Sequence, residues 1–91
     1  MKPLTKAQRA VLEKMADGYV LHVVLHYRPD HVSRFLHKEG SAPGIRGIRE
    51  ATLHQLRLRG FIGPKWRDPI RVRSWQITDA GRKEVKASRP D

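Results

Sequence analysis

Basic side chains alternate with apolar or aromatic ones in the stretch "KWRDPIRVRSW", residues 65–75. The four cations of this stretch are Lys65, Arg67, Arg71 and Arg73. A guanidinium offers five N–H donors in a planar fork, and this fork fits the oxygens of a phosphate. On a strand, Arg71 and Arg73 share one face with Trp75, whereas Ile70 and Val72 share the other. The spacing therefore predicts an extended surface that presents cations to a negatively charged ligand.

A simpler interpretation of the same stretch is that edge hairpins carry charge to avoid pairing with neighbouring strands. Charges of both signs would serve that purpose, yet this stretch has four cations and a single acid, Asp68. Contact with a nucleic acid, contact with an acidic protein and a solvated face all stay open. The one-sided charge favours the first.

The composition of the whole chain points the same way. The 91 residues carry 19 Lys and Arg against 9 Asp and Glu, a formal charge of +10, which makes polyanions the first candidate partners. Eight of the basic residues, against two acids, lie between residues 46 and 73. The length predicts a single domain, 1–87, with a flexible tail at 88–91. We expect a cytoplasmic protein without membrane contact, because no apolar run resembles a signal peptide or a membrane span.

Two helices are expected from capping and periodicity. Thr5 and Gln8 have the spacing of a capping box, and Gly18 suits the residue after a helix end, so helix is predicted over residues 6–17. The stretch "IREATLHQLRLRG" predicts a second helix at 48–59, closed by Gly60. Ile48, Thr52, Leu53 and Leu56 should line its buried side, and Glu50, His54 and Arg57 fall on the opposite arc.

Two hairpins are expected as well. Apolar and polar residues alternate over 19–28, which is typical of a strand, and Pro29-Asp30 is a turn signal. The return run 31–38 fits either a strand or a helix, and we favour a strand that completes a hairpin. Residues 61–68 and 69–78 form the second hairpin, with Asp68-Pro69 at its tip. Thr78 is expected to cap a short final helix that packs lightly through Val85.

This order of elements resembles the winged helix-turn-helix superfamily. The likeness is most specific in "ATLHQLRLRGFI", which is similar to a recognition helix running into a wing, and in "WQITDAGRKEV", which looks like the return strand and the closing helix. With the first helix, the resemblance covers residues 4–17 and 45–87. It implies an α+β, winged-helix-like domain with a β-hairpin, at 19–38, where the family has a further helix.

The resemblance also implies a function and a site. Members of this family place the recognition helix in the major groove of DNA, and the wing touches the backbone or the minor groove. We therefore expect a small transcriptional regulator, or a DNA-binding protein of a phage or mobile element, that binds double-stranded DNA. The expected DNA-binding residues are Arg46, Arg49, His54, Arg57, Lys65, Arg67, Arg71 and Arg73.

Other partners stay open beside double-stranded DNA. The rival function is that of an adaptor or inhibitor whose basic face binds an acidic protein. RNA is a weaker third partner, because Trp66 offers a stacking platform. A homodimer is plausible, with Tyr19 to Tyr27 as a possible seam.

Catalysis, cofactors and metals are not expected. The stretch "GIRGIREAT" lacks the spacing of a phosphate-binding loop, and no serine has the context of a nucleophile. The chain has no cysteine, so thiolate metal sites and disulfides are excluded. Its five histidines match no zinc motif, and the four at 22, 26, 31 and 37 are expected on a polar outer surface of the first hairpin.

Overall fold

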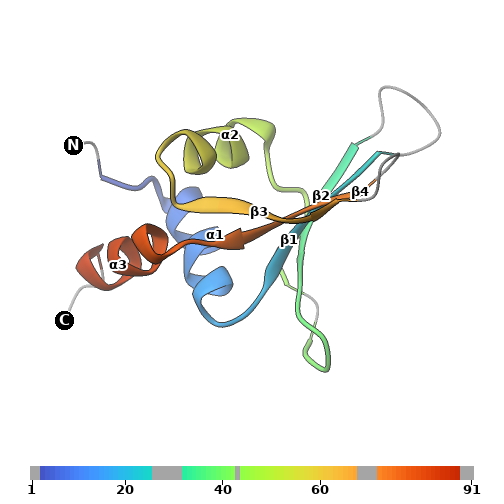
Figure 1. Ribbon diagram of the computed structural model, residues 1–91, viewed down its shortest axis with the longest axis horizontal. Coiled ribbons are helices and arrows are strands. Elements are labelled where there is room, and N and C mark those ends of the chain that lie inside the picture. Colours follow the sequence, from blue (N-terminus) through green and yellow to red (C-terminus); the bar gives the residue numbers. More distant parts are fainter. Residues whose placement is uncertain (1–2, 26–31, 43, 68–71, 89–91) are drawn as a thin grey trace.

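The computed structural model describes residues 3–25, 32–42, 44–67 and 72–88, which form an α+β domain of three helices and one four-stranded antiparallel sheet (Figure 1). The order of strands across the sheet is β2-β1-β4-β3. The elements are α1 (Lys6–Ala16), β1 (Val20–Leu25), β2 (Val32–His37), α2 (Glu50–Leu58), β3 (Ile62–Arg67), β4 (Val72–Ile77) and α3 (Asp79–Ser88). The types and the order of these elements are those expected from the sequence.

The first helix forms where its capping residues predicted it. The Thr5 hydroxyl accepts a hydrogen bond from the Gln8 amide, and the Gln8 side chain accepts one from the Thr5 amide, both at 3.1 Å. This reciprocal pair satisfies two N–H groups that the helix leaves free at its start. Gly18 follows the helix end with a φ of 103°, a conformation that glycine adopts without steric cost.

The segment that fits either a strand or a helix is a strand. β1 and β2 pair antiparallel in a register that runs from Val20 opposite His37 to Leu25 opposite Val32. The two proline-containing turns, at Pro29-Asp30 and Asp68-Pro69, lie outside the described residues. The preference for a first hairpin is thus confirmed by its strands.

The two hairpins are joined into one sheet, which the sequence did not predict. β1 pairs antiparallel with β4, with Leu21 opposite Trp75 and Val23 opposite Arg73. This pairing links strands about fifty residues apart, and such a contact leaves no mark on a local pattern of alternation. Its consequence is that the second hairpin continues the sheet that the first hairpin begins.

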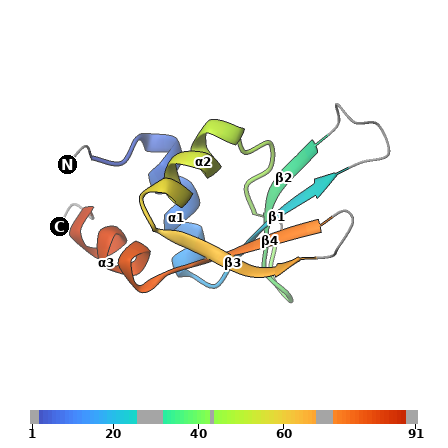
Figure 2. The same cartoon turned by 45° about the horizontal axis from the view of Figure 1, so that its top comes forward.

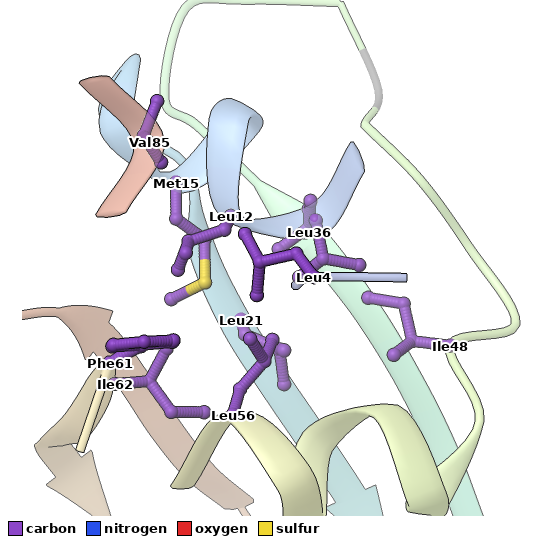
Figure 3. Close-up of a cluster of buried hydrophobic side chains, with 11 residues drawn as sticks. Leu4, Leu12, Met15, Leu21, Leu36, Ile48, Leu56, Phe61, Ile62 and Val85 are labelled. Carbon is purple, nitrogen blue, oxygen red and sulfur yellow. The ribbon is translucent and has the colours of Figure 1, made fainter. Parts of the chain in front are cut away.

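The core lies between the helices and one face of the sheet. Leu21 and Leu36 of the sheet pack with Leu12 and Met15 of α1 and with Leu56 of α2, and each is exposed by 2% or less (Figure 3). Side chains alternate between the two faces of a strand, so the neighbours of these sheet residues turn away from the helices. This face is called the helix-side face below, and the other is called the open face.

The second helix begins two residues later than predicted. Arg49 is its N-cap, and Ile48 is buried beside β2, where its amide donates to the Arg34 carbonyl at 3.2 Å. The Leu36 amide likewise donates to the Ile45 carbonyl at 2.8 Å, and Arg46 forms an isolated antiparallel bridge with Phe35. Residues 45–48 therefore extend along the edge of β2, and this pairing competes successfully with an earlier helix start.

The last helix packs more tightly than predicted. Thr78 caps it as expected, because its hydroxyl accepts a hydrogen bond from the Gly81 amide at 3.1 Å. Val85 is only 2% exposed, and a Cβ at position 81 would meet the Phe61 carbonyl oxygen. A close approach of this kind needs glycine, so α3 is fixed to the body by Gly81 as well as by Val85. The helix ends at Ser88, the first residue of the expected tail.

Candidate nucleic-acid interface

The helix-side face of the sheet changes from apolar to basic along its strands. Leu21 and Ile77 pack on the core near the helices, whereas Arg73 and Arg34 lie farther along the strands. Figure 2 shows this part of the sheet extending past the helices, away from α3. Val23 is opposite Arg34 on one side and opposite Arg73 on the other. The register thus places two arginines in one row that crosses the sheet.

The row continues to the last strand of the sheet. The backbone of Arg67 pairs with that of Arg73, so positions 67, 73, 23 and 34 follow one another across β3, β4, β1 and β2. Adjacent strands are about 4.8 Å apart, which makes the row roughly 14 Å long. Three of its four positions carry arginine.

The second helix lies beside this row and contacts it and the neighbouring Trp75 near its two ends. Its N-terminal residue, Glu50, lies 3.7 Å from the guanidinium of Arg34, and near its other end the Arg57 guanidinium lies 5.9 Å from the centre of the Trp75 ring. Trp75 is on the helix-side face, adjacent to Arg73 in the alternation of β4. We use the name arginine channel for the surface made up of Arg34, Glu50, Arg57, Arg73 and Trp75.

The channel has more donors and positive charge than acceptors. Glu50 is the acid that lines it, and its side chain is 82% exposed, so the ion pair with Arg34 is screened by water and holds neither group firmly. Among the described residues, the buried Arg34 Nε and Trp75 Nε1 have no hydrogen-bond partner. These two atoms are buried, so it is the guanidinium groups of Arg57 and Arg73, on exposed residues, that favour a ligand rich in oxygen acceptors.

Four of the predicted DNA-binding residues gather around this channel. Arg57 and Arg73 line it, both exposed. His54 is exposed on the same side of α2 as Glu50 and Arg57, because positions 50, 54 and 57 follow the helical repeat. Arg49 caps the start of α2 and, together with Arg34, lines a groove at the edge of β2.

Two predicted residues lie on the other face of the sheet. Arg46 is bridged to Phe35, and directly opposed residues of an antiparallel pair share a face, which here is the open face. Lys65 lines a groove with His22, His37 and Ser74, also on the open face. The structure thus places Arg46 and Lys65 apart from the other predicted residues, because the bulge after Pro64 and the pairing of 45–48 set their directions.

Two more predicted residues cannot be placed as side chains. Arg71 lies outside the described residues, and for Arg67 only the backbone is described. Arg34, in contrast, was missed by the sequence analysis. The signal was its position two residues from Val32 and from Leu36. If 32–37 is a strand, these three residues share one face, whereas in a helix they would not.

Two histidines of the first hairpin, His22 and His37, form a ring cluster with Phe35 on the open face. His22 lies 5.5 Å from Phe35 and 5.9 Å from His37, measured between ring centres, and its Nδ1 is 2.7 Å from the Ser74 hydroxyl. Burial lowers the pKa of His22, and the neighbouring His37 and Lys65 lower it further. Within the described ranges, no three His, Asp or Glu side chains are arranged to hold a metal ion.

Tyr19, the first residue of the suggested dimer seam, makes its contacts inside the chain. Its hydroxyl donates to the Ala42 carbonyl at 3.1 Å, and the ammonium groups of Lys14 and Lys38 lie 5.5 and 6.0 Å from its ring centre. Tyr27 is outside the described residues. None of the described helices is long and apolar enough to cross a membrane.

Comparison with known proteins finds a relative of which this chain matches only a part. No family model and no solved structure matches the chain. A curated protein to which it is similar is the exodeoxyribonuclease 7 large subunit of Nitrosomonas europaea, with 28% identity over 99 residues. The similarity covers 98% of this chain and 22% of that protein. The chain thus spans about a fifth of the length of the relative that it matches. None of these comparisons tests the resemblance to winged helix-turn-helix proteins, which stays a prediction.

Proposed function

We propose that this protein binds double-stranded DNA through the arginine channel and the adjacent exposed side of α2. The observation that carries the proposal is the arginine row on the helix-side face, with Arg57 placed beside it by the second helix. Guanidinium groups bind phosphate oxygens in pairs of parallel hydrogen bonds. The channel supplies several such groups on one surface, accompanied by one exposed carboxylate.

The dimensions of the row suit a duplex. The major groove of B-DNA is about 12 Å wide, and the row is roughly 14 Å long. The row is therefore about as long as this groove is wide. Arg49 and His54 extend the same basic surface along α2, where they are positioned for contacts to the backbone or to base edges.

The curated relative supports the same class of partner. By its name, that protein is a subunit of a nuclease that acts on DNA. The proposal for this chain is a binding role without catalysis. A role in transcription, or in a phage or mobile element, is an expectation from the winged-helix resemblance.

The test is a titration of a fluorescein-labelled 20-base-pair duplex at several salt concentrations, read by anisotropy. The variant Arg57→Ala/Arg73→Ala removes two charges from the channel, and Lys83→Ala/Lys86→Ala removes two exposed charges from α3. The slope of log K against log salt should become shallower by about 0.9 for each lost phosphate contact, so by up to about 1.8 in the channel variant. The α3 variant should keep the slope of the wild type.

Two outcomes would overturn the proposal. One is equal changes in slope for the channel and α3 variants, because the channel would then be no more than part of a diffuse positive charge. The other is the absence of duplex binding by the wild type at low salt, where the electrostatic contribution is strongest. In that case an acidic protein becomes the first candidate partner.

A further inference from the structure

The open face of the sheet carries an unusual set of side chains for a surface that no described helix covers. α1 contacts β2 and β4, and α2 contacts β3, through the helix-side face where Leu21, Leu36 and Ile62 are buried. A solvated sheet face is normally polar. Here it includes the partly buried Val20, Val24, Val72 and Phe35 together with His22 and the exposed His37.

One row of this face crosses the sheet from β4 to the segment beside β2. Ser74 is opposite His22, His22 is opposite Phe35, and Phe35 is bridged to Arg46. The rings of His22 and Phe35 are 5.5 Å apart and tilted by 38°, and His37 adds a third ring 5.9 Å from His22. The hydrogen bond between His22 and the buried Ser74 fixes the central imidazole. The three rings therefore gather at one place on the open face, inclined to one another by 38° and 55°, and we call this ring cluster the platform.

Cations stand at both ends of this platform. At one end, Lys65 shares a groove with His22, His37 and Ser74. At the other, the exposed Arg46 borders a groove of about 790 Å³ at the edge of β2, which Val24 and Phe35 line together with Arg34 and Arg49, a size within the roughly 300–1,000 Å³ typical of ligand pockets. Both cations were predicted to contact DNA, yet both lie on the face away from the arginine channel.

Rings flanked by cations match the chemistry of unpaired nucleotides. Every base has a π-face that stacks on an aromatic ring, and the backbone between bases carries phosphates. A duplex hides the faces of its bases, so it could use the cations but not the rings. A protein partner would use the valines but would leave the cations at both ends without a necessary role.

We propose that the open face binds single-stranded DNA, with bases stacked on Phe35 and His37 and phosphates held by Arg46 and Lys65. The rings and Lys65 of this site lie on the opposite face of the sheet from Arg73, and the two proposed sites meet at the groove on the edge of β2. A protein with both sites can hold a duplex and an adjacent unpaired strand at the same time.

The experiment uses fluorescein-labelled dT12 and the 20-base-pair duplex as separate probes with the full chain. Phe35→Leu removes the aromatic ring but keeps apolar volume, and it should weaken dT12 binding by at least about fivefold, as expected for one lost base stack. Phe35→Trp should restore it. His37→Ala tests the same platform at an exposed position where folding is not at risk. Neither Phe35→Leu nor His37→Ala should change the affinity for the duplex.

The controls separate this inference from the proposed function. Lys83→Ala/Lys86→Ala on α3 should leave dT12 binding unchanged. If dT12 fails to bind, or if Phe35→Leu and His37→Ala bind it like the wild type, the inference is wrong, and duplex binding then decides the proposed function on its own. Binding of rU12 more than tenfold tighter than dT12 would overturn the choice of DNA in favour of RNA.

Discussion

The surroundings of His22 disfavour the protonated, positively charged form of its imidazole. Burial removes water from the imidazole, and His37 and Lys65 lie close enough to repel its protonated form. Its Nδ1 is nevertheless held at 2.7 Å by the Ser74 hydroxyl, and its ring lies against Phe35. These contacts are compatible with the neutral imidazole, so the native state favours the unprotonated form and has a lowered pKa.

This lowered pKa predicts a loss of stability in mild acid. In the unfolded chain His22 binds a proton near the ordinary pKa of 6.5, whereas the native state binds it only at lower pH. Between these two values the unfolded state holds more protons, so the free energy of unfolding falls as pH decreases through this window. Urea denaturation at pH 7.5 and at successive steps down to pH 5 should show a smaller loss for His22→Gln than for the wild type. Parallel curves for the two proteins would contradict this assignment.

At the scale of single residues, the sequence predicted well what depends on near neighbours. The Thr5–Gln8 cap, the Thr78 cap and the left-handed Gly18 and Gly60 all form as expected. The directions of Arg34, Arg46 and Lys65 were not predictable in the same way. They depend on strand register, on a bulge and on an edge pairing, each of which is set by residues far along the chain.

The second helix illustrates how an element presents different faces to the core and to solvent. Thr52 and Leu56 are buried, Leu53 is partly buried, and Glu50, His54 and Arg57 are exposed, in agreement with the predicted helical wheel. Leu58 is also on the outside, with 63% of its surface exposed, whereas Leu56 is completely buried. The helix therefore contains two leucines, two positions apart, in opposite environments.

These two leucines make a matched pair for testing the orientation of α2. Leu56→Ala should reduce the free energy of unfolding by about 2–5 kcal/mol, because it leaves a cavity between the helix and the core. Leu58→Ala removes the same atoms from the surface and should change it by no more than about 0.5 kcal/mol. Equal losses in chemical denaturation would show that α2 is rotated relative to the orientation described. Far-UV circular dichroism verifies that each variant is folded before the comparison.

At the scale of elements, the sequence predicted the type and order of all the helices and strands described, and it favoured the correct alternative for 32–37. The predicted start of the second helix, at residue 48, was wrong because Ile48 fits two different patterns. Its apolar side chain fits a helical stripe, but it is buried beside β2 instead. Local patterns show that a residue is buried without showing which element buries it.

At the scale of the whole molecule, the pairing of β1 with β4 connects the two proposed binding surfaces. His22 of the ring platform and Val23 of the arginine row are adjacent in β1, and their partners Ser74 and Arg73 are adjacent in β4. Because successive residues of a strand face opposite sides, one pair of strands supports both surfaces. Which of the two surfaces a cation joins depends on this central pairing, which local sequence patterns do not show.

The central pairing predicts that the two hairpins unfold together. If β1 and β4 are the middle strands of one sheet, the amides of His22 and Val24 should exchange with deuterium only through the opening that also exposes Ser74 and Val72. Their protection, measured by NMR under native conditions, should therefore correspond to similar opening free energies, close to the global free energy of unfolding. The outer strand β3 is the internal control, because it is joined to the sheet only through β4. Ile62 at the start of this strand is buried. Protection that is high in β3 and β4 but near zero in β1 and β2 would mean that the first hairpin opens independently. Two surfaces that depend on one pair of strands would then be inconsistent with the dynamics of the protein.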